Sequence, residues 1–192
     1  MLSMEELTLD LLIEKIQSSD HAERAAARDH AGPVGARAMV PLAKIAATGE
    51  LEIARAANRA MQNLVYYAGR PGAEDEAKAV SLELLKLLGD DQPMQLRRDV
   101  LWMTWQIADS QAVGPVAELL AIPDLHEDAR MALERLPGEE ATAALQAALA
   151  TAADEDKPAI AHSLRVRGVE VPGVPDLRLK PVKETSVQPV GR

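Results

Sequence analysis

The sequence predicts an all-α protein, built as a single file of short helix pairs. Three observations support this. Ala and Leu, both strong helix formers, dominate the apolar residues, whereas the chain has no Phe, two Trp and two Tyr. The twelve Pro and eleven Gly residues punctuate the chain between amphipathic segments. The same pattern of charged and apolar residues returns at nearly regular intervals, which is typical of repeat architectures.

The individual helices follow from their start and stop signals. Three residue pairs have capping-box spacing, in which each side chain satisfies a free backbone N–H: Ser3 with Glu6, Asp20 with Glu23 and Asp124 with Glu127. Gly32-Pro33, Gly69 and Gly89 mark helix ends. We expect helices over residues 4–18, 20–31, 34–47, 51–68, 73–88, 93–108, 111–121, 124–136, 139–152 and 155–167.

The second helices of successive pairs can be aligned on one position. This position is occupied in turn by Arg24, Arg55, Arg98, Arg130 and Ile160, and an apolar stripe at helical spacing accompanies it. Neither helix of a pair can bury its stripe alone, so neighbouring pairs must stack. The longest step of the alignment contains "YYAGRPGAEDE", which we interpret as an insertion loop beside a binding face.

Several phrases resemble a known repeat family. "GPVGARAMVPLAKIA", "VGPVAELLA" followed by "HEDARMALERLPG", and "EEATAALQAALATA" are similar to HEAT repeats of the short bacterial type, over about residues 20–168. The resemblance implies a right-handed superhelix whose second helices line a concave groove. The predicted fold is therefore a HEAT-like solenoid, an α-α superhelix of about five helix pairs, over residues 1–168, followed by an extended, Pro-containing C-terminal arm, residues 169–192.

This C-terminal arm, "VEVPGVPDLRLKPVKETSVQPVGR", differs from the rest of the chain. It is slightly basic, whereas the chain as a whole has a formal charge of −9, and its apolar residues alternate with polar ones. Three interpretations remain open: a flexible terminus, a cap over the last repeat, or an arm that binds its own groove or a partner.

Composition excludes several function classes. The absence of cysteine excludes disulfides, thiolate catalysis and Cys-based zinc sites, and it fits a reducing compartment. No apolar run approaches the roughly 18 residues of a membrane-spanning helix, and the start lacks a basic signal-peptide region. We therefore expect a cytoplasmic protein. A pI near 5.0 disfavours nucleic acid as a partner, because the phosphate backbone would be repelled.

The segment "RRDVLWMTWQIAD" carries the most suggestive side chains. Trp102 and Trp105 are neighbours on a helix, and Asp109 lies one turn beyond. Two indoles beside a carboxylate could hold a cationic or damaged base, because an aromatic face attracts positive charge. HEAT-like alkylpurine glycosylases are similar in using Trp and Asp in their groove. The alternatives are a core position for at least one Trp, and a peptide-binding aromatic patch that Tyr66 and Tyr67 would join.

The recurring arginines also have two interpretations. They could bond across to an acidic residue or carbonyl of the next repeat and so fix its orientation, or they could line the groove as a basic surface for an acidic peptide or phosphate. Arg55, Arg98 and Arg130 therefore join the aromatic residues and Asp109 as candidate partner-binding residues.

Metal and cofactor sites are not expected. His126-Glu127 is the one His-Glu pair, too few ligands for the di-iron centre of the HEAT-like hydroxylase, and we interpret Glu127 as a capping partner of Asp124. No phosphate-binding loop, nucleophile elbow or HExxH motif is present.

We expect a non-enzymatic interaction scaffold that binds a peptide or partner protein in its concave groove. The alternative is a HEAT-like enzyme or lyase-type protein that handles a DNA base or cofactor through Trp102, Trp105 and Asp109. A homodimer joined through end faces or tails is a further possibility. Fold alone does not decide between these functions.

Overall fold

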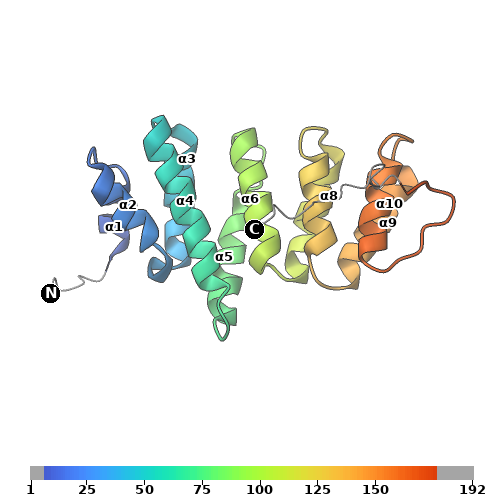
Figure 1. Cartoon of the computed structure of the whole chain (residues 1–192), viewed down its shortest axis with the longest axis horizontal. Helices are drawn as coiled ribbons and strands as arrows, with labels where there is room; N and C mark the ends of the chain where they lie inside the picture. Colours follow the sequence, from blue (N-terminus) through green and yellow to red (C-terminus); the bar gives the residue numbers. More distant parts are fainter. Residues whose placement is uncertain (1–6, 177–192) are drawn as a thin grey trace, which may run out of the picture.

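The computed structural model describes residues 7–176, over which the chain is all-helical and contains no strand (Figure 1). Five helix pairs follow one another: α1 (Leu9–Ile16) and α2 (His21–Asp29), α3 (Met39–Thr48) and α4 (Leu51–Ala68), α5 (Glu74–Lys86) and α6 (Met94–Ile107), α7 (Val113–Glu118) and α8 (His126–Arg135), α9 (Glu139–Thr151) and α10 (Lys157–Val166). The predicted solenoid of five helix pairs is confirmed. No helix among these residues is long and apolar enough to cross a bilayer.

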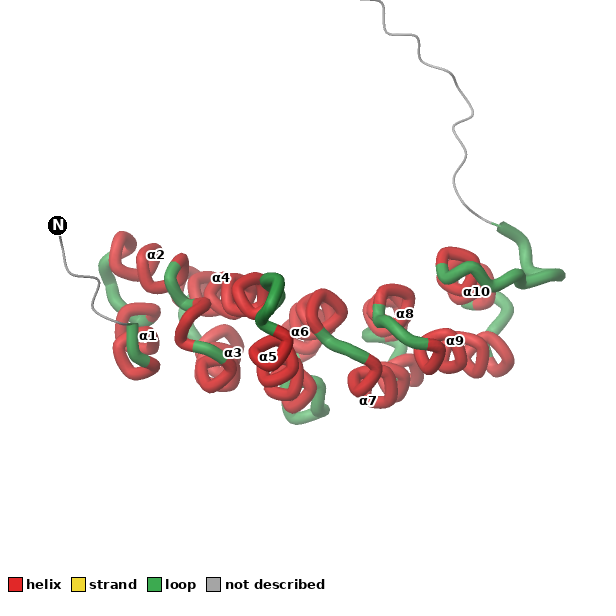
Figure 2. Tube along the Cα trace, turned by 90° about the horizontal axis from the view of Figure 1, so that it is seen from below, coloured by secondary structure: helices red, strands yellow, loops and turns green. Residues whose placement is uncertain are grey.

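The pairs stand in a single row, with their two helices on opposite sides. Figure 2 shows α2, α4, α6, α8 and α10 along one side of the row and the first helices along the other. The row bends toward the second helices, so that their side is shallowly concave. We call the exposed side of these five helices the second-helix face. The resemblance to HEAT repeats predicted a concave groove on this side.

One core runs through the whole row. Small side chains fill the contact between α2 and α4, where Ala27, Ala57 and Ala60 are fully or almost fully buried. Larger side chains fill the middle of the stack, among them Leu101 and Leu133. Alanine lets helix axes approach closely, so an apolar fraction of 47% suffices to bury a continuous core without any Phe.

The first helices of the second and fourth pairs begin later than predicted. Residues Gly32–Val34 and Ala36–Ala38 form two 3-10 turns before α3, and Ser110–Ala112 forms another before α7. Gly35 separates the first two turns with a φ of +82°, a conformation that an α-helix does not contain. The α-helix therefore cannot begin at residue 34.

Of the capping predictions that fall on described residues, the one at α2 was right for Asp20 and the one at α8 was wrong. Asp20 caps α2, because its carboxylate accepts the backbone N–H of Ala22 at 2.7 Å, although Glu23 instead accepts from the hydroxyl of Ser18 at 2.6 Å. In the described chain α1 begins at Leu9, where Thr8 is its N-cap. Ser3 and Glu6 lie outside the described residues.

The capping box expected at α8 is absent. The N-cap residue of α8 is Leu125, and no side chain caps this end of the helix. Asp124 contributes its backbone carbonyl to Arg98 instead, and the Glu127 carboxylate pairs with Arg130 at 2.8 Å. Both acidic residues thus belong to contacts of arginines.

The predicted insertion loop is mostly helix. α4 has 18 residues and α5 has 13, and only residues 69–73 separate them, so the long step lengthens the helices. The turn projects at the lower edge of the row in Figure 1. Arg70 holds it together: its guanidinium lies 3.9 Å from the Tyr67 ring centroid and 2.5 Å from the Glu76 carboxylate.

The start of the C-terminal arm covers the last helix pair. The guanidinium of Arg165 donates to the backbone carbonyls of Val171, Val174 and Pro175. Val169 and Val171 pack against the core. Residues 169–176 of the arm therefore lie against the last helix, and the remaining residues of the arm lie outside the described part of the chain.

Candidate functional site

The exposed apolar side chains gather on the second helices. Eight large apolar side chains are exposed among the described residues, and two of them, Val40 and Leu82, belong to first helices. The other six lie on second helices: Leu51, Tyr66, Tyr67, Trp102, Met131 and Val166. Apolar side chains concentrated on one face of a folded protein are typical of an interaction surface.

Trp102 and Trp105 form a supported pair on α6. Their ring centroids are 6.2 Å apart and the ring planes meet at 84°, an edge-to-face contact. Trp105 packs against the core, and the guanidinium of Arg135 lies 5.1 Å from its ring centroid. Trp102 remains 46% exposed. The inner indole, which is partly buried, therefore supports the outer and exposed one.

Asp109 does not act with the two indoles. It is exposed, and its carboxylate accepts the backbone N–H of Gln111 at 3.0 Å, which caps the 3-10 turn Ser110–Ala112. Within the described chain no hydrogen bond connects Asp109 to either Trp. The structure thus brings Trp102 and Trp105 together and leaves the carboxylate at the turn after α6.

The two tyrosines do not extend the Trp pair into one cluster. Tyr67 lies against Gly32, in the turn that follows α2: a Cβ added to Gly32 would lie 2.5 Å from the Cβ of Tyr67. The guanidinium of Arg70 covers the Tyr67 ring. Tyr66 is 54% exposed on α4. Between residues 7 and 176 neither Tyr ring contacts a Trp ring. Tyr66 and Trp102 are therefore separate apolar contacts on the second-helix face.

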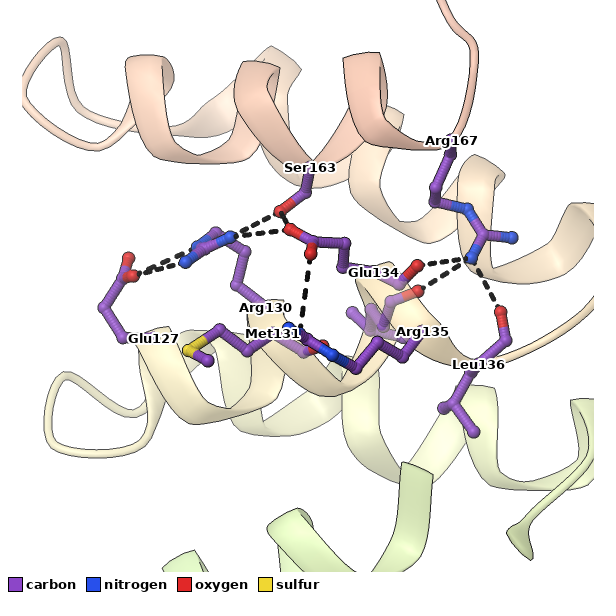
Figure 3. A network of polar contacts seen from close by, with 9 residues as sticks. Glu127, Arg130, Met131, Glu134, Arg135, Leu136, Ser163 and Arg167 are labelled. Carbon is purple, nitrogen blue, oxygen red and sulfur yellow. Dashed lines mark hydrogen bonds and ion pairs between the residues drawn. The ribbon is translucent and has the colours of Figure 1, made fainter. Parts of the chain in front are cut away.

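Arg98 and Arg130 bridge successive pairs, as the structural interpretation predicted. Arg98 on α6 donates to the carbonyl of Asp124 at 2.7 Å and lies 3.3 Å from the carboxylate of Asp128 on α8. Arg130 on α8 reaches the hydroxyl of Ser163 on α10, as Figure 3 shows, and Glu134 lies 3.4 Å away. Only 8% of Arg130 is exposed. These two arginines fasten the C-terminal half of the row.

Arg24 and Arg55 make no such bridge within the described chain. For these two arginines, the interpretation that they bond across to the next repeat was wrong. The Arg24 guanidinium donates to the carbonyls of Ser18 and Ser19 at 2.7 and 3.0 Å, in the turn before its own helix. Arg55 pairs with Glu52 on its own helix at 2.8 Å, and its side chain is 65% exposed. Neither side chain connects α2 to α4.

A basic hollow lies here, as the second interpretation of the recurring arginines has it, but it also includes Arg28 and Arg59, which that interpretation did not name. A cavity of about 200 Å³ separates the exposed sides of α2 and α4, and its lining holds four arginines and one histidine. We call it the arginine cleft; it is lined by His21, Arg24, Ala25, Arg28, Glu52, Arg55, Ala56 and Arg59. The missed signal is that Arg24-Arg28 and Arg55-Arg59 both have i, i+4 spacing, at the same place in successive second helices.

The cleft arginines differ in how far they are neutralised. Arg28 donates to the Asp29 carboxylate at 2.8 Å, and this hydrogen bond lowers the pKa of Asp29 and raises that of Arg28. Arg55 has Glu52 as its partner. Arg59 is exposed and has no hydrogen-bond or ion-pair partner within residues 7–176. It is the guanidinium most available to a ligand.

A second hollow lies on the other side of the row and has different chemistry. It measures about 630 Å³, and alanines of α7, α9 and the following turn make up much of its wall. His126 also lines it: Nδ1 donates to the carbonyl of Leu120 at 2.8 Å, while Nε2 is buried and has no hydrogen-bond partner among residues 7–176. No cluster of three or more potential metal ligands occurs in the described ranges.

Comparisons with known proteins give the following findings. No protein-family model and no curated protein sequence matches the chain. Among solved structures, the designed armadillo repeat protein YIII(Dq)4CqI is similar, with 15% identity over 82% of this chain and 99% of that chain and a TM-score of 0.37. A second, YIII(Dq.V1)4CPAF in complex with the peptide (KR)4, has 16% identity over 82% of this chain and 98% of that chain, and a TM-score of 0.39.

Proposed function

We propose that this protein is a non-enzymatic interaction scaffold, with repeats of the HEAT type, which binds an extended segment of a partner protein across its second-helix face. The observation that carries the proposal is the exposed Trp102, held by Trp105 and accompanied by the other exposed apolar side chains of the second helices. The absence of cysteine from the sequence suits the reducing cytoplasm, and we propose that the protein resides there.

Trp102 has the properties of a binding hot spot. An indole that is already fixed by an edge-to-face neighbour loses little conformational freedom when a partner covers it. Met131 on the neighbouring helix α8 is 42% exposed and adds a flexible apolar surface that can adapt to the partner's side chain. A long, shallow face of this kind suits a peptide segment better than a small molecule.

The enzymatic alternative has less support. It requires Trp102, Trp105 and Asp109 to act on one ligand, whereas the Asp109 carboxylate caps a turn and makes no hydrogen bond to the indoles in the described part of the chain. Base or cofactor chemistry would need an ionisable group that the indoles share. We therefore favour binding without catalysis.

The proposal is tested with peptides selected from a random display library against the full-length protein. Trp102→Ala is the test variant, and Leu82→Ala on first helix α5 is the matched control, because Leu82 is 44% exposed. We expect Trp102→Ala to weaken binding of the selected peptides by about 30-fold, as hot-spot truncations do. Leu82→Ala should leave their affinity unchanged. Equal affinity for both variants, or a failure to select any peptide, would overturn the proposal.

A further inference from the structure

We propose that the arginine cleft is a carboxylate-binding site, which takes an acidic stretch of the partner peptide. This inference rests on the proposed function and adds the chemistry of the partner. Four guanidinium groups and one imidazole, from two adjacent helices, line a hollow of about 200 Å³ on the second-helix face. That volume suits one or two acidic side chains and is too small for a folded domain.

The geometry presents two parallel rows of charge. Side chains four residues apart lie about 5–6 Å apart on one side of a helix. Arg24 and Arg28 form such a row on α2, and Arg55 and Arg59 form the other on α4, which packs beside α2 (Figure 2). The planar guanidinium fork matches the two oxygens of a carboxylate.

The charge in the cleft opposes that of the whole chain. Asp29 pairs with Arg28 and Glu52 pairs with Arg55, so two of the four arginine charges, those of Arg24 and Arg59, have no ion-pair partner in the described chain, while the whole chain carries −9. The two carbonyls that accept from Arg24 leave its charge uncompensated, and Arg59 has no partner among the described residues. An acidic peptide therefore meets attraction here and repulsion over much of the remaining surface.

Packing between α2 and α4 does not use the four guanidinium groups. Each of them bonds to its own helix, to the turn before that helix, or to no group in the described chain, whereas the contact from α4 to Arg28 is made to its backbone carbonyl by Asn63. Like charges one turn apart also disfavour both helices. A ligand that carries negative charge supplies the missing compensation.

The surroundings of the cleft favour a peptide over nucleic acid. Farther along the second-helix face, α8 exposes Glu127 and half-exposes Asp128, which would repel a continuous phosphate backbone. A peptide can place acidic residues in the cleft and an apolar residue on Trp102. The proposed ligand is thus a segment with acidic side chains at one end and an apolar side chain at the other.

The test uses the full chain and a fluorescein-labelled hexaglutamate peptide, with binding followed by anisotropy at about 50 mM salt, where screening is weak. We expect the double variant Arg55→Ala/Arg59→Ala to weaken binding by at least tenfold. The control Arg70→Ala removes an arginine outside the cleft, whose side chain is 39% exposed, and should change the affinity less than twofold. Urea unfolding midpoints check that each variant is folded.

A gain-of-function variant makes the test sharper. Asp29→Asn removes the carboxylate that neutralises Arg28, so it should tighten hexaglutamate binding about threefold. Equal losses in the double variant and Arg70→Ala would show nonspecific attraction and overturn the inference. Full displacement by inorganic phosphate at low millimolar concentration would reassign the cleft to a free anion and overturn it as well.

Failure of this inference can be told apart from failure of the proposed function. Hexaglutamate has no apolar side chain, so its binding should be the same in wild type and Trp102→Ala. If hexaglutamate does not bind while the library-selected peptides still depend on Trp102, the scaffold proposal stands and the acidic specificity is wrong. If hexaglutamate binds through the cleft while no library peptide depends on Trp102, the cleft stands without the apolar contact.

Discussion

The two ends of the row use arginine in opposite ways. Between α8 and α10, Arg130 is buried and reaches Glu134 and Ser163 (Figure 3). Between α2 and α4, Arg55 occupies the equivalent position of its repeat and stays exposed. Arg130 meets a hydroxyl on the next second helix, α10, whereas Arg55 pairs with Glu52 on its own helix and lines the cleft together with alanines and further arginines. One position of the repeat can thus serve stability in one pair and be free for binding in another.

A second arginine at the C-terminal end, Arg167, also joins neighbouring helix pairs. The Arg167 guanidinium donates to the backbone carbonyls of Leu133, Glu134 and Leu136 at 3.1, 3.0 and 2.6 Å. These carbonyls end α8 and carry the negative end of its dipole, which a cation stabilises. Arg167 thereby caps α8 from the residue that follows α10.

The largest effect on stability is expected when Arg130, the cation of the buried network with Glu134 and Ser163, is replaced. Arg130→Met removes the buried cation beside Glu134, whose side chain is only 12% exposed, and leaves it the more exposed Arg135 at 3.5 Å and the hydroxyl of Ser163. We expect this variant to lower the free energy of unfolding by about 3 kcal/mol. Urea titration followed by circular dichroism measures it, with Arg55→Met as the control at the equivalent exposed position, where a change under about 0.5 kcal/mol is expected. Equal midpoints for the two variants would erase the contrast between the two ends.

A smaller loss should follow from removing the cap on α8. Arg167→Ala leaves several carbonyl groups at the end of α8 without a donor, so we expect a loss of about 2 kcal/mol. The effect should be local, because each pair of a solenoid contacts only its neighbours. Hydrogen exchange measures this: amides of α9 and α10 should exchange faster while those of α4 keep their protection. Uniform acceleration over the row would contradict a local role.

The helices could be predicted from sequence because their signals are local. α4 runs from Leu51 to Ala68, as its apolar periodicity and Gly69 indicate. The contacts of individual side chains could not be predicted, since they depend on distant segments. Ser163, the partner of Arg130, is 33 residues away, and no local pattern points to it. Asp124 is not the cap of α8, because this helix has Leu125 as its N-cap and begins at His126.

The same distinction between local signals and contacts of distant segments applies to the candidate site. The proximity of Trp102 and Trp105 follows from their spacing on one helix and was predicted, whereas the edge-to-face angle of their rings was not. The arginine cleft needs two helices from different pairs, so its residues join only when α2 packs against α4. Comparing whole turns of aligned second helices, rather than one position, would have found Arg28 and Arg59.

At the cleft the expected change in stability is small and opposite in sign. Arg59→Ala removes a positive charge one turn from Arg55, so we expect the free energy of unfolding to rise by about 0.3 kcal/mol, since like charges at this spacing repel. Replicate urea titrations against wild type, at about 10 mM salt to limit screening, can resolve this change. A loss above 1 kcal/mol would mean that Arg59 supports the fold, and the division between fastening and free arginines would need revision.

The smallest expected effect concerns the exposed ion pair of Arg70 and Glu76. It tests whether an exposed ion pair stabilises the row as the buried contacts of Arg130 do. The hydrogen bond from Arg70 lowers the pKa of Glu76 below its ordinary value of 4.5. A lowered carboxyl pKa means that the pair's contribution to stability is fully present above about pH 4.5 and is lost as the pH falls through the Glu76 pKa. An NMR titration of the Glu76 carboxyl should therefore give a midpoint below 4.5, and Arg70→Ala should return it to that value. Because both groups are exposed, unfolding midpoints of wild type and Arg70→Ala at pH 7 should nearly coincide. A clear difference between them would place Arg70 with Arg130 and Arg167 among the arginines that hold the row together.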